Sequence, residues 1–402
     1  MRSFLPGLCF LLLFSAPFSH AQNYKFDGSI SEEVLRNYLA RSMTMMEALT
    51  DDGFEDNFRM FTYCGGKFFG RGVYVWGRES RLLEKVAEAK KNIAKLHAAD
   101  PDIIVEACIF EIISKDVNGI AVPAWAFEGL GRTVEQRNFR YDDIIYADGK
   151  GRKWGANAEV PDVSRPETKL WFYFLAATYI DAGCEVIHYG QTEIMDNNDP
   201  HLDHWSEVLA QARGYAKKKA RRHMLLCDSH VPSGGLVRDG KLLMDFHAFP
   251  LRIKEVAETP RKAILELGYT DGLYGRSKGG ITPSGWKCEH LPYLVEFDNY
   301  GRSRTPGEAA GAFWVWGWDE ITWFSQLSKD DRDAWLRYAW TWVRKTDPNG
   351  YLEMPGYRMI SGAPDGKRIY RASNPSDANP EGYGQENTIR EIWKNDSAKP
   401  ES

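Results

Sequence analysis

The sequence predicts an α/β fold, a (β/α)8 or TIM barrel, on three observations. Helix-like and strand-like segments alternate, several strand-like segments are almost wholly apolar, and 402 residues are enough for eight βα units with insertions. Such alternation implies a parallel sheet with right-handed crossovers, and strands covered on both faces are apolar throughout. A doubly wound open sheet is the alternative. It would carry a glycine-rich phosphate-binding turn after its first strand, and residues 65–72 do not match that pattern.

The first part of the chain contains two predicted helices and two predicted strands. Ser31 can cap a helix over residues 32–49, and a strand follows at residues 67–76. The helix over residues 79–97 has a single apolar stripe at helical spacing. Residues 103–110 form a nearly continuous apolar run, which indicates a buried parallel strand.

A long insertion is predicted after this second strand. Residues 118–165 show no periodicity and are rich in Gly, Asp and Arg. Loops of this length are usually functional or disordered. Because the segment carries aromatic residues such as Trp125 and Trp154, we expect it to be ordered.

The remaining chain repeats the βα pattern. A helix over residues 166–183 begins with Pro166, a favourable first helical residue. The elements expected after it are a strand at 186–194, a helix at 203–220, a strand at 224–228, short strands near 242–246, 263–267, 292–297 and 312–316, and a helix at 328–345. About eight strands result, as the barrel requires.

Three segments are expected along the chain. Residues 1–21 have the features of a cleavable signal peptide, with Arg2 before a short apolar run and Ser19-His20-Ala21 as cleavage site. Residues 22–350 form the barrel, and the Pro- and Gly-rich residues 351–402 form a tail packed on it. No later window has the ~20 apolar residues that a membrane span needs, so we predict a secreted or periplasmic protein without one.

Composition narrows the class of ligand. The formal net charge is −5, which disfavours nucleic acid as a partner. The chain has 14 Trp and 19 Tyr residues, and such rings stack on the flat faces of sugars. Five of the six cysteines follow the signal peptide. Their wide spacing and odd number argue for buried free thiols rather than a disulfide framework.

Polar and aromatic side chains follow the predicted strands, where a (β/α)8 barrel has its active site. We predict Glu193 as acid/base and Glu296 as nucleophile, because hydrolysis of a glycosidic bond needs two carboxyl groups beside it. Further residues expected to bind substrate are Arg71, Trp76, Glu111, Gln191, Asp228, His230, Asp245, His247, Asn299, Trp316 and Trp318.

Three of these segments resemble motifs of the clan A retaining glycosidases. His188-Tyr189-Gly190-Gln191-Thr192-Glu193 is similar to the end of that clan's fourth strand, and Leu294–Asn299 to the end of its seventh. Phe313–Trp316 is similar to the aromatic segment after its eighth strand. The resemblance implies a secreted bacterial glycoside hydrolase with Glu193 as acid/base and Glu296 as nucleophile. The chain departs from the clan at Thr192, where an Asn is usual, and Glu193 follows only the third predicted strand.

Two other functions remain open. A barrel without catalysis could hold a glycan by its aromatic side chains alone. A metal-dependent hydrolase could use Asp228, His230, Asp245 and His247, because Asp-x-His on neighbouring strands is typical of a metal site. For the preferred glycosidase we expect a carbohydrate substrate, no cofactor and no metal.

Overall fold

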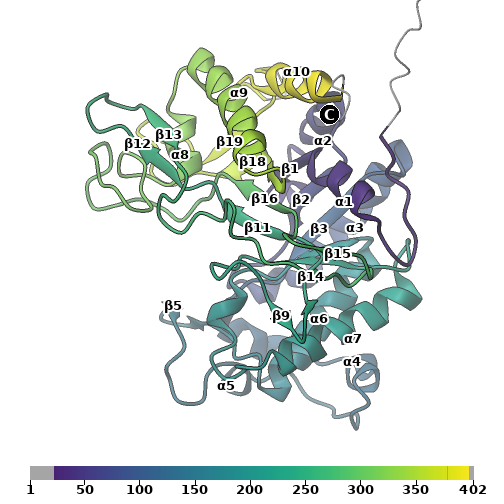
Figure 1. The fold of residues 1–402 in the computed structure, drawn as a ribbon. Coiled ribbons are helices and arrows are strands. Elements are labelled where there is room, and N and C mark those ends of the chain that lie inside the picture. The colour runs from purple at the N-terminus through teal and green to yellow at the C-terminus, as the bar shows by residue number, and fades with distance from the viewer. Residues whose placement is uncertain (1–21, 378, 398–402) are drawn as a thin grey trace, which may run out of the picture.

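The computed structural model describes residues 22–377 and 379–397 (Figure 1). The predicted signal peptide lies outside the described residues. Among those that are described, no helix is long and apolar enough to cross a membrane. The five cysteines in this part of the chain are free, and four of them are buried, as predicted.

The largest sheet has seven strands in the order β19-β18-β1-β2-β3-β7-β8. Neighbouring strands are parallel, except that β19 is antiparallel to β18. The strands are β1 (Ser42–Met45), β2 (Phe68–Val73), β3 (Ile104–Cys108), β7 (Val186–His188), β8 (Leu226–Asp228), β18 (Met354–Met359) and β19 (Ile369–Arg371).

A second parallel sheet adjoins the first at both edges. It contains β11 (His247–Pro250), β16 (Tyr293–Glu296) and β17 (Gly350–Leu352). Only Glu353 separates β17 from β18 along the chain. Just before β11, the backbone N–H of Asp245 donates to the carbonyl of Cys227 in β8 at 2.8 Å. None of these sheets closes on itself, so the (β/α)8 barrel stays a prediction. The two junctions support it.

Helices pack on the outer side of these strands. They include α2 (Phe54–Cys64), α3 (Leu82–Ala99), α6 (Pro166–Ala182), α7 (Asp203–Lys219), α8 (Glu320–Ser325), α9 (Lys329–Thr346) and α10 (Glu386–Ser397) (Figure 1). The predicted insertion folds over α6 with α4 (Ala124–Gly129), α5 (Tyr141–Ile144) and the small sheet β4 (Ile113–Ser114), β5 (Lys153–Gly155) and β6 (Ala158–Glu159). The Phe139 and Trp171 rings meet at 4.9 Å. Because the insertion covers α6, this helix is buried around most of its circumference.

An apolar cluster closes the amino ends of the strands. Phe68, Ile104 and Val186 begin β2, β3 and β7 and pack together, with Leu35 and Tyr38 of α1 (Glu32–Leu39) in the same cluster. Ser31 caps α1 by accepting a hydrogen bond from the backbone of Val34 at 3.3 Å, as predicted. The space at this end of the strands is therefore filled with apolar side chains.

Five predicted elements differ from the structure. Of the strand expected near residues 242–246, only Leu242 lies in a strand, β10 (Lys241–Leu242), and the parallel strand β11 follows at His247–Pro250. The helix expected over residues 32–49 ends at Leu39, and β1 follows it, because the alternate Met residues of β1 continued an apolar pattern that fits either element. Residues 312–316 form a loop. The strand near residue 263, β13 (Ala263–Leu265), pairs antiparallel with β12 (Ile253–Glu255) outside the parallel sheets. Residues 351–359, assigned to a surface tail, lie largely in β17 and β18.

The added strand β1 changes the numbering of the later ones. Counted from β1 along the chain, β7 is the fourth parallel strand and β16 the seventh. Glu193 thus follows the fourth strand, and Glu296 ends the seventh. The remaining short strands are β9 (Val237–Arg238), β10 (Lys241–Leu242), β14 (Gly280–Ile281) and β15 (Lys287–Cys288), which form a separate four-stranded sheet.

Candidate functional site

Glu296 is held between two arginines, which we call the arginine clamp. Arg71 of β2 contacts Oε1 of Glu296, and Arg358 of β18 contacts Oε2. All three side chains are almost completely buried. Arg71 has a left-handed backbone (φ 55°), and its N–H donates to Oε2 of Glu106 at 2.8 Å. The clamp thus fixes the predicted nucleophile at the carboxyl ends of three parallel strands.

The clamp continues into the loop after β16. Arg358 donates to Oδ1 of Asn299 at 3.0 Å and to Oδ1 of Asp298 at 3.3 Å. Burial would raise the pKa of Asp298, but Arg358 and Arg71 outweigh it and hold this pKa below its usual value. Asn299, expected to bind substrate, is therefore next to Glu296, with its side-chain oxygen engaged by the clamp.

Two buried histidines face the same region. Nδ1 of His188 lies 2.7 Å from Oδ2 of Asp228, and its Nε2 lies 3.5 Å from a guanidinium nitrogen of Arg71. Burial and the charge of Arg71 lower the pKa of His188 to about 3. Burial and Arg252 lower the pKa of His230 to about 3 as well. Both imidazoles are therefore neutral near pH 7.

Glu193 lies in a pocket of its own. Its carboxylate accepts hydrogen bonds from the backbone N–H of Ser233 at 3.2 and 3.3 Å. The pocket has a volume of about 290 Å³, and Asp196 and Lys278 also line it, whereas Arg71, Glu296 and Arg358 do not. In the described contacts, Glu193 is not joined to the arginine clamp.

Glu111 and Gln191 are a second pair that the structure brings together. The backbone N–H of Gln191 donates to Oε2 of Glu111 at 2.9 Å, and its side-chain amide donates to Oε1 at 2.8 Å. Gly190 makes this approach possible, since a Cβ there would lie 2.0 Å from Oε2 of Glu111. The pair joins the loops after β3 and β7.

The predicted aromatic residues divide into two groups. Trp76 is 42% exposed, and its ring lies 5.1 Å from Phe110 and 5.4 Å from Trp154. Trp316 and Trp318 are buried, and the indole N–H of Trp316 donates to the carbonyl of Lys262. Of the three, Trp76 is the exposed one, and the neighbouring Trp154 is partly exposed, with the Arg152 guanidinium 4.1 Å from its ring centre.

The four residues of the metal alternative do not converge. Asp228 faces His188, whereas Asp245 accepts a hydrogen bond from Arg213 of α7 at 2.8 Å on the outer side of the strands. His230 packs edge-on against Phe249 at 4.5 Å. His247 is fully buried, and neither ring nitrogen has a hydrogen-bond partner. This set is therefore not one ligand sphere.

Sequence reasoning missed Glu106, His188, Glu353 and Arg358. Glu106 and His188 interrupt apolar strands, and such charged or polar interruptions were the available signal. Arg358 and Glu353 were missed because their segment was assigned to the tail.

Comparison with known proteins adds no identity. No protein-family model matches the chain, and a search of curated protein sequences finds no match.

Proposed function

We propose that this protein is an exported glycoside hydrolase on a (β/α)8 barrel, with Glu296 as nucleophile. The observation that carries the proposal is the arginine clamp. It holds one carboxylate rigidly at the end of the seventh parallel strand, where this architecture has its reacting groups. A nucleophile must be held near its attacking geometry, and a clamped side chain meets that requirement.

Each residue has a defined role in this proposal. Glu296 attacks the anomeric carbon, and Glu193 donates a proton to the leaving oxygen and later removes one from water. A retaining reaction requires the two carboxyl groups to be about 5–5.5 Å apart. Glu193 therefore gives up its bonds to Ser233 when substrate binds. Trp76 and Trp154 stack on a sugar at the rim.

The test is hydrolysis of a panel of aryl glycosides by the purified protein. We expect Glu296→Gln and Glu193→Gln to abolish turnover, while Glu84→Gln, an exposed control on α3, leaves it unchanged. With an activated aryl glycoside, azide should restore turnover to Glu296→Ala and yield a glycosyl azide. Full activity of Glu296→Gln would refute the assignment of the nucleophile.

A glycan-binding protein without catalysis is the second candidate. Glu193 lies in a separate pocket, and arginines already contact both oxygens of Glu296, so neither carboxylate is free. Calorimetric titration with oligosaccharides separates the candidates. Binding that needs Trp76, without turnover of any glycoside, would favour this second function.

A further inference from the structure

Next to the clamp, three buried side chains from neighbouring strands converge on one point. Glu106 of β3, His188 of β7 and Asp228 of β8 each offer one ligand atom, and these atoms lie within 4.8 Å of one another. All three residues are at least nine-tenths buried. They come from adjacent parallel strands that pair along their backbones, so their relative positions are fixed by the sheet.

One atom of this cluster lacks a partner. Oδ2 of Asp228 meets the His188 ring, but Oδ1 has no hydrogen-bond partner among the described residues, although the residue is fully buried. An unsatisfied buried carboxylate oxygen costs free energy unless a proton or a cation meets it. A proton shared with the neighbouring carboxyl group of Glu106, or a bound cation, would meet this atom.

The surrounding charges point the same way. The buried carboxyl groups of Glu106, Asp228, Glu296 and Glu353 lie in one electrostatic neighbourhood with Arg71, and Arg358 is the second guanidinium there. With Asp298, which also contacts Arg358, five carboxyl groups lie near these two guanidinium groups.

We propose that Glu106, His188 and Asp228 form a binding site for one divalent transition-metal ion. One imidazole nitrogen with two carboxylate oxygens suits Mn²⁺, Co²⁺ or Zn²⁺ better than Mg²⁺ or Ca²⁺, which prefer oxygen ligands alone. The 2.7 Å contact between His188 Nδ1 and Asp228 Oδ2 has the length of a hydrogen bond, so these two atoms would move apart slightly to bind one ion. The site differs from the four-residue set suggested by sequence, of which only Asp228 belongs to it. It does not depend on the proposed glycosidase activity.

The experiment measures metal content and thermal stability of the full chain. The protein is stripped by a chelator and then incubated with Mn²⁺, Co²⁺, Zn²⁺ or Mg²⁺. Bound metal is counted after excess metal has been removed, and Tm is measured with the free ion present. We expect one transition-metal ion per chain and a Tm raised by roughly 5 °C or more at a hundredfold excess over Kd. The Co²⁺ form should show visible absorption bands from a site with a nitrogen ligand, and Mg²⁺ should leave Tm unchanged.

Variants assign the site to these three residues. Asp228→Asn and His188→Gln should lose the bound metal and the Tm shift, and two variants are used in case one fails to fold. Glu79→Gln is the matched control, because Glu79 is an equally buried glutamate that bonds Ser114 elsewhere. Glu79→Gln should keep the bound metal and the Tm shift. No bound metal in the wild type, or an unchanged metal content in both site variants, would overturn the proposal.

Discussion

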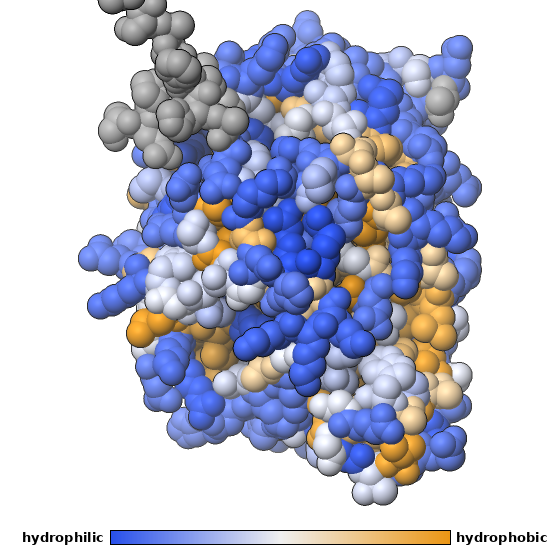
Figure 2. Space-filling model, turned by 90° about the vertical axis from the view of Figure 1, so that its right-hand side faces the viewer, coloured by the Kyte–Doolittle hydropathy of each residue, from blue (hydrophilic) through white to orange (hydrophobic). Residues whose placement is uncertain are grey.

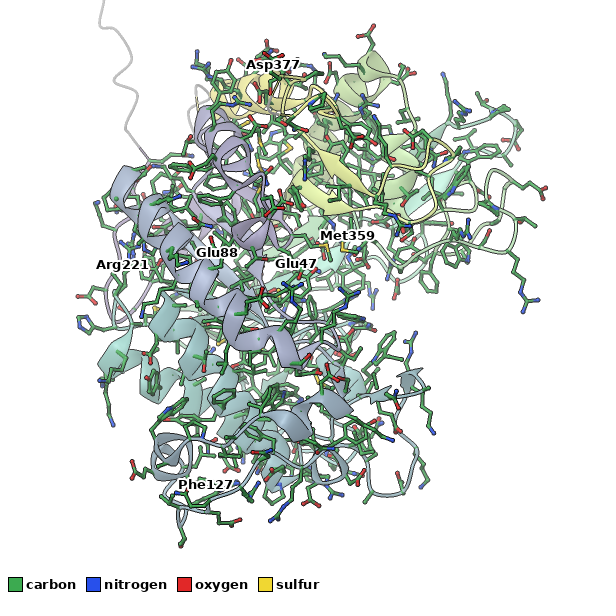
Figure 3. The ribbon with its side chains drawn as sticks, turned by 180° about the vertical axis from the view of Figure 1, so that it is seen from behind. Glu47, Glu88, Phe127, Arg221, Met359 and Asp377 are labelled. Atoms are coloured by element: carbon green, nitrogen blue, oxygen red, sulfur yellow. The ribbon has the colours of Figure 1, made fainter. Side chains whose placement is uncertain are left out.

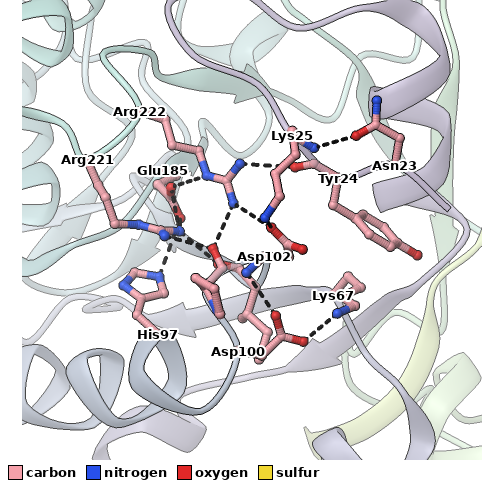
Figure 4. Close-up of polar contacts among 12 residues, drawn as sticks. Asn23, Tyr24, Lys25, Lys67, His97, Asp100, Asp102, Glu185, Arg221 and Arg222 are labelled. Carbon is pink, nitrogen blue, oxygen red and sulfur yellow. Dashed lines mark hydrogen bonds and ion pairs between the residues drawn. The ribbon is translucent and has the colours of Figure 1, made fainter. Parts of the chain in front are cut away.

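The two ends of the parallel strands use the same ion-pair chemistry for different purposes. At the amino end, Glu185 precedes β7 and lies between Arg221, Arg222 and His97 (Figure 4). At the carboxyl end, Glu296 lies between Arg71 and Arg358. In Figure 3, Arg221 lies at the left-hand side of the molecule, and Glu47 and Met359, which follow β1 and end β18, lie near its middle. Each region thus buries one glutamate between arginines.

The N–H groups of these arginines that do not contact the glutamate have different partners at the two ends. Arg222 donates to the backbone carbonyls of Tyr24 and Pro101, and Arg221 to that of Ile103, so this network ties chain segments together. Figure 2 shows one face of the molecule, where hydrophilic residues cover most of the surface and hydrophobic residues gather along its right-hand part. At the carboxyl end, the spare donors meet side chains instead, namely Asp298, Asn299 and His188. Bonds to backbone are typical of a structural network, and titratable neighbours are typical of a site.

The largest expected effect is on activity at the carboxyl end. Glu296→Gln should lower kcat of a glycosidase by roughly 10⁴-fold or more, because it removes the nucleophile. Glu185→Gln is its matched partner, since it also breaks a buried pair between glutamate and arginine. It should lower the Tm and leave kcat of the folded enzyme within about threefold. Equal losses of kcat in both variants would remove the distinction between the two ends.

The next effect is on stability. Arg358→Met leaves Glu296 with one arginine and should lower the free energy of unfolding by about 3–5 kcal/mol, because breaking a buried pair strands a charge. Arg221→Met should cost less, since its side chain is one-third exposed and Arg222 still pairs with Glu185. Urea denaturation of both variants measures the difference. A larger loss for Arg221→Met would show that the amino-end network carries more of the stability.

His247, the first residue of β11, makes the stability of the fold sensitive to acid. Its burial lowers its pKa to about 3, so the folded protein keeps it neutral while the unfolded chain takes up a proton below about pH 6.5. The free energy of unfolding therefore falls as pH falls, by about 2 kcal/mol between pH 7 and pH 5 for this residue. His247→Leu should flatten that slope without losing a hydrogen bond, because neither ring nitrogen has a partner.

The control for this prediction is His201→Leu at an exposed position. Urea midpoints at pH 5 and pH 7 are compared for wild type and both variants. If His247→Leu keeps the wild-type dependence on pH, His247 is not neutral in the folded protein.

The sequence predicted some of the parallel strands and missed others, and the difference has a physical reason. Strands such as β3, β8 and β16 lie in mainly apolar runs, so they were found. β1 was missed because its four residues, with Met43 and Met45, continue the apolar pattern of α1. β18 was missed because its Pro355 and Gly356 are typical of a loop. Local pattern cannot recognise a strand whose burial comes entirely from distant neighbours.

Candidate site residues divide in the same way. Arg71, Glu296 and Asn299 were selected because they follow or end recognised strands, and they do lie together. Arg358 could not be selected, because its strand was not recognised. The orientation of a side chain after a strand also depends on loop contacts, and so sequence could not place Glu193 against Ser233 or turn Asp245 toward Arg213.

The smallest expected effect concerns the exposed ring at the carboxyl end. Trp76→Ala should weaken binding of an oligosaccharide by about 5–10-fold, because a stacked ring contributes roughly 1 kcal/mol beyond its buried area. Trp125→Ala is the matched control: Trp125 is similarly exposed at 38% but lies on α4, where it stacks on Phe174 at 5.7 Å. Calorimetric titration gives Kd for each. Because both changes remove one half-exposed indole, a loss confined to Trp76→Ala assigns the glycan to the rim beside Trp154, and a loss confined to Trp125→Ala would place it on α4 instead.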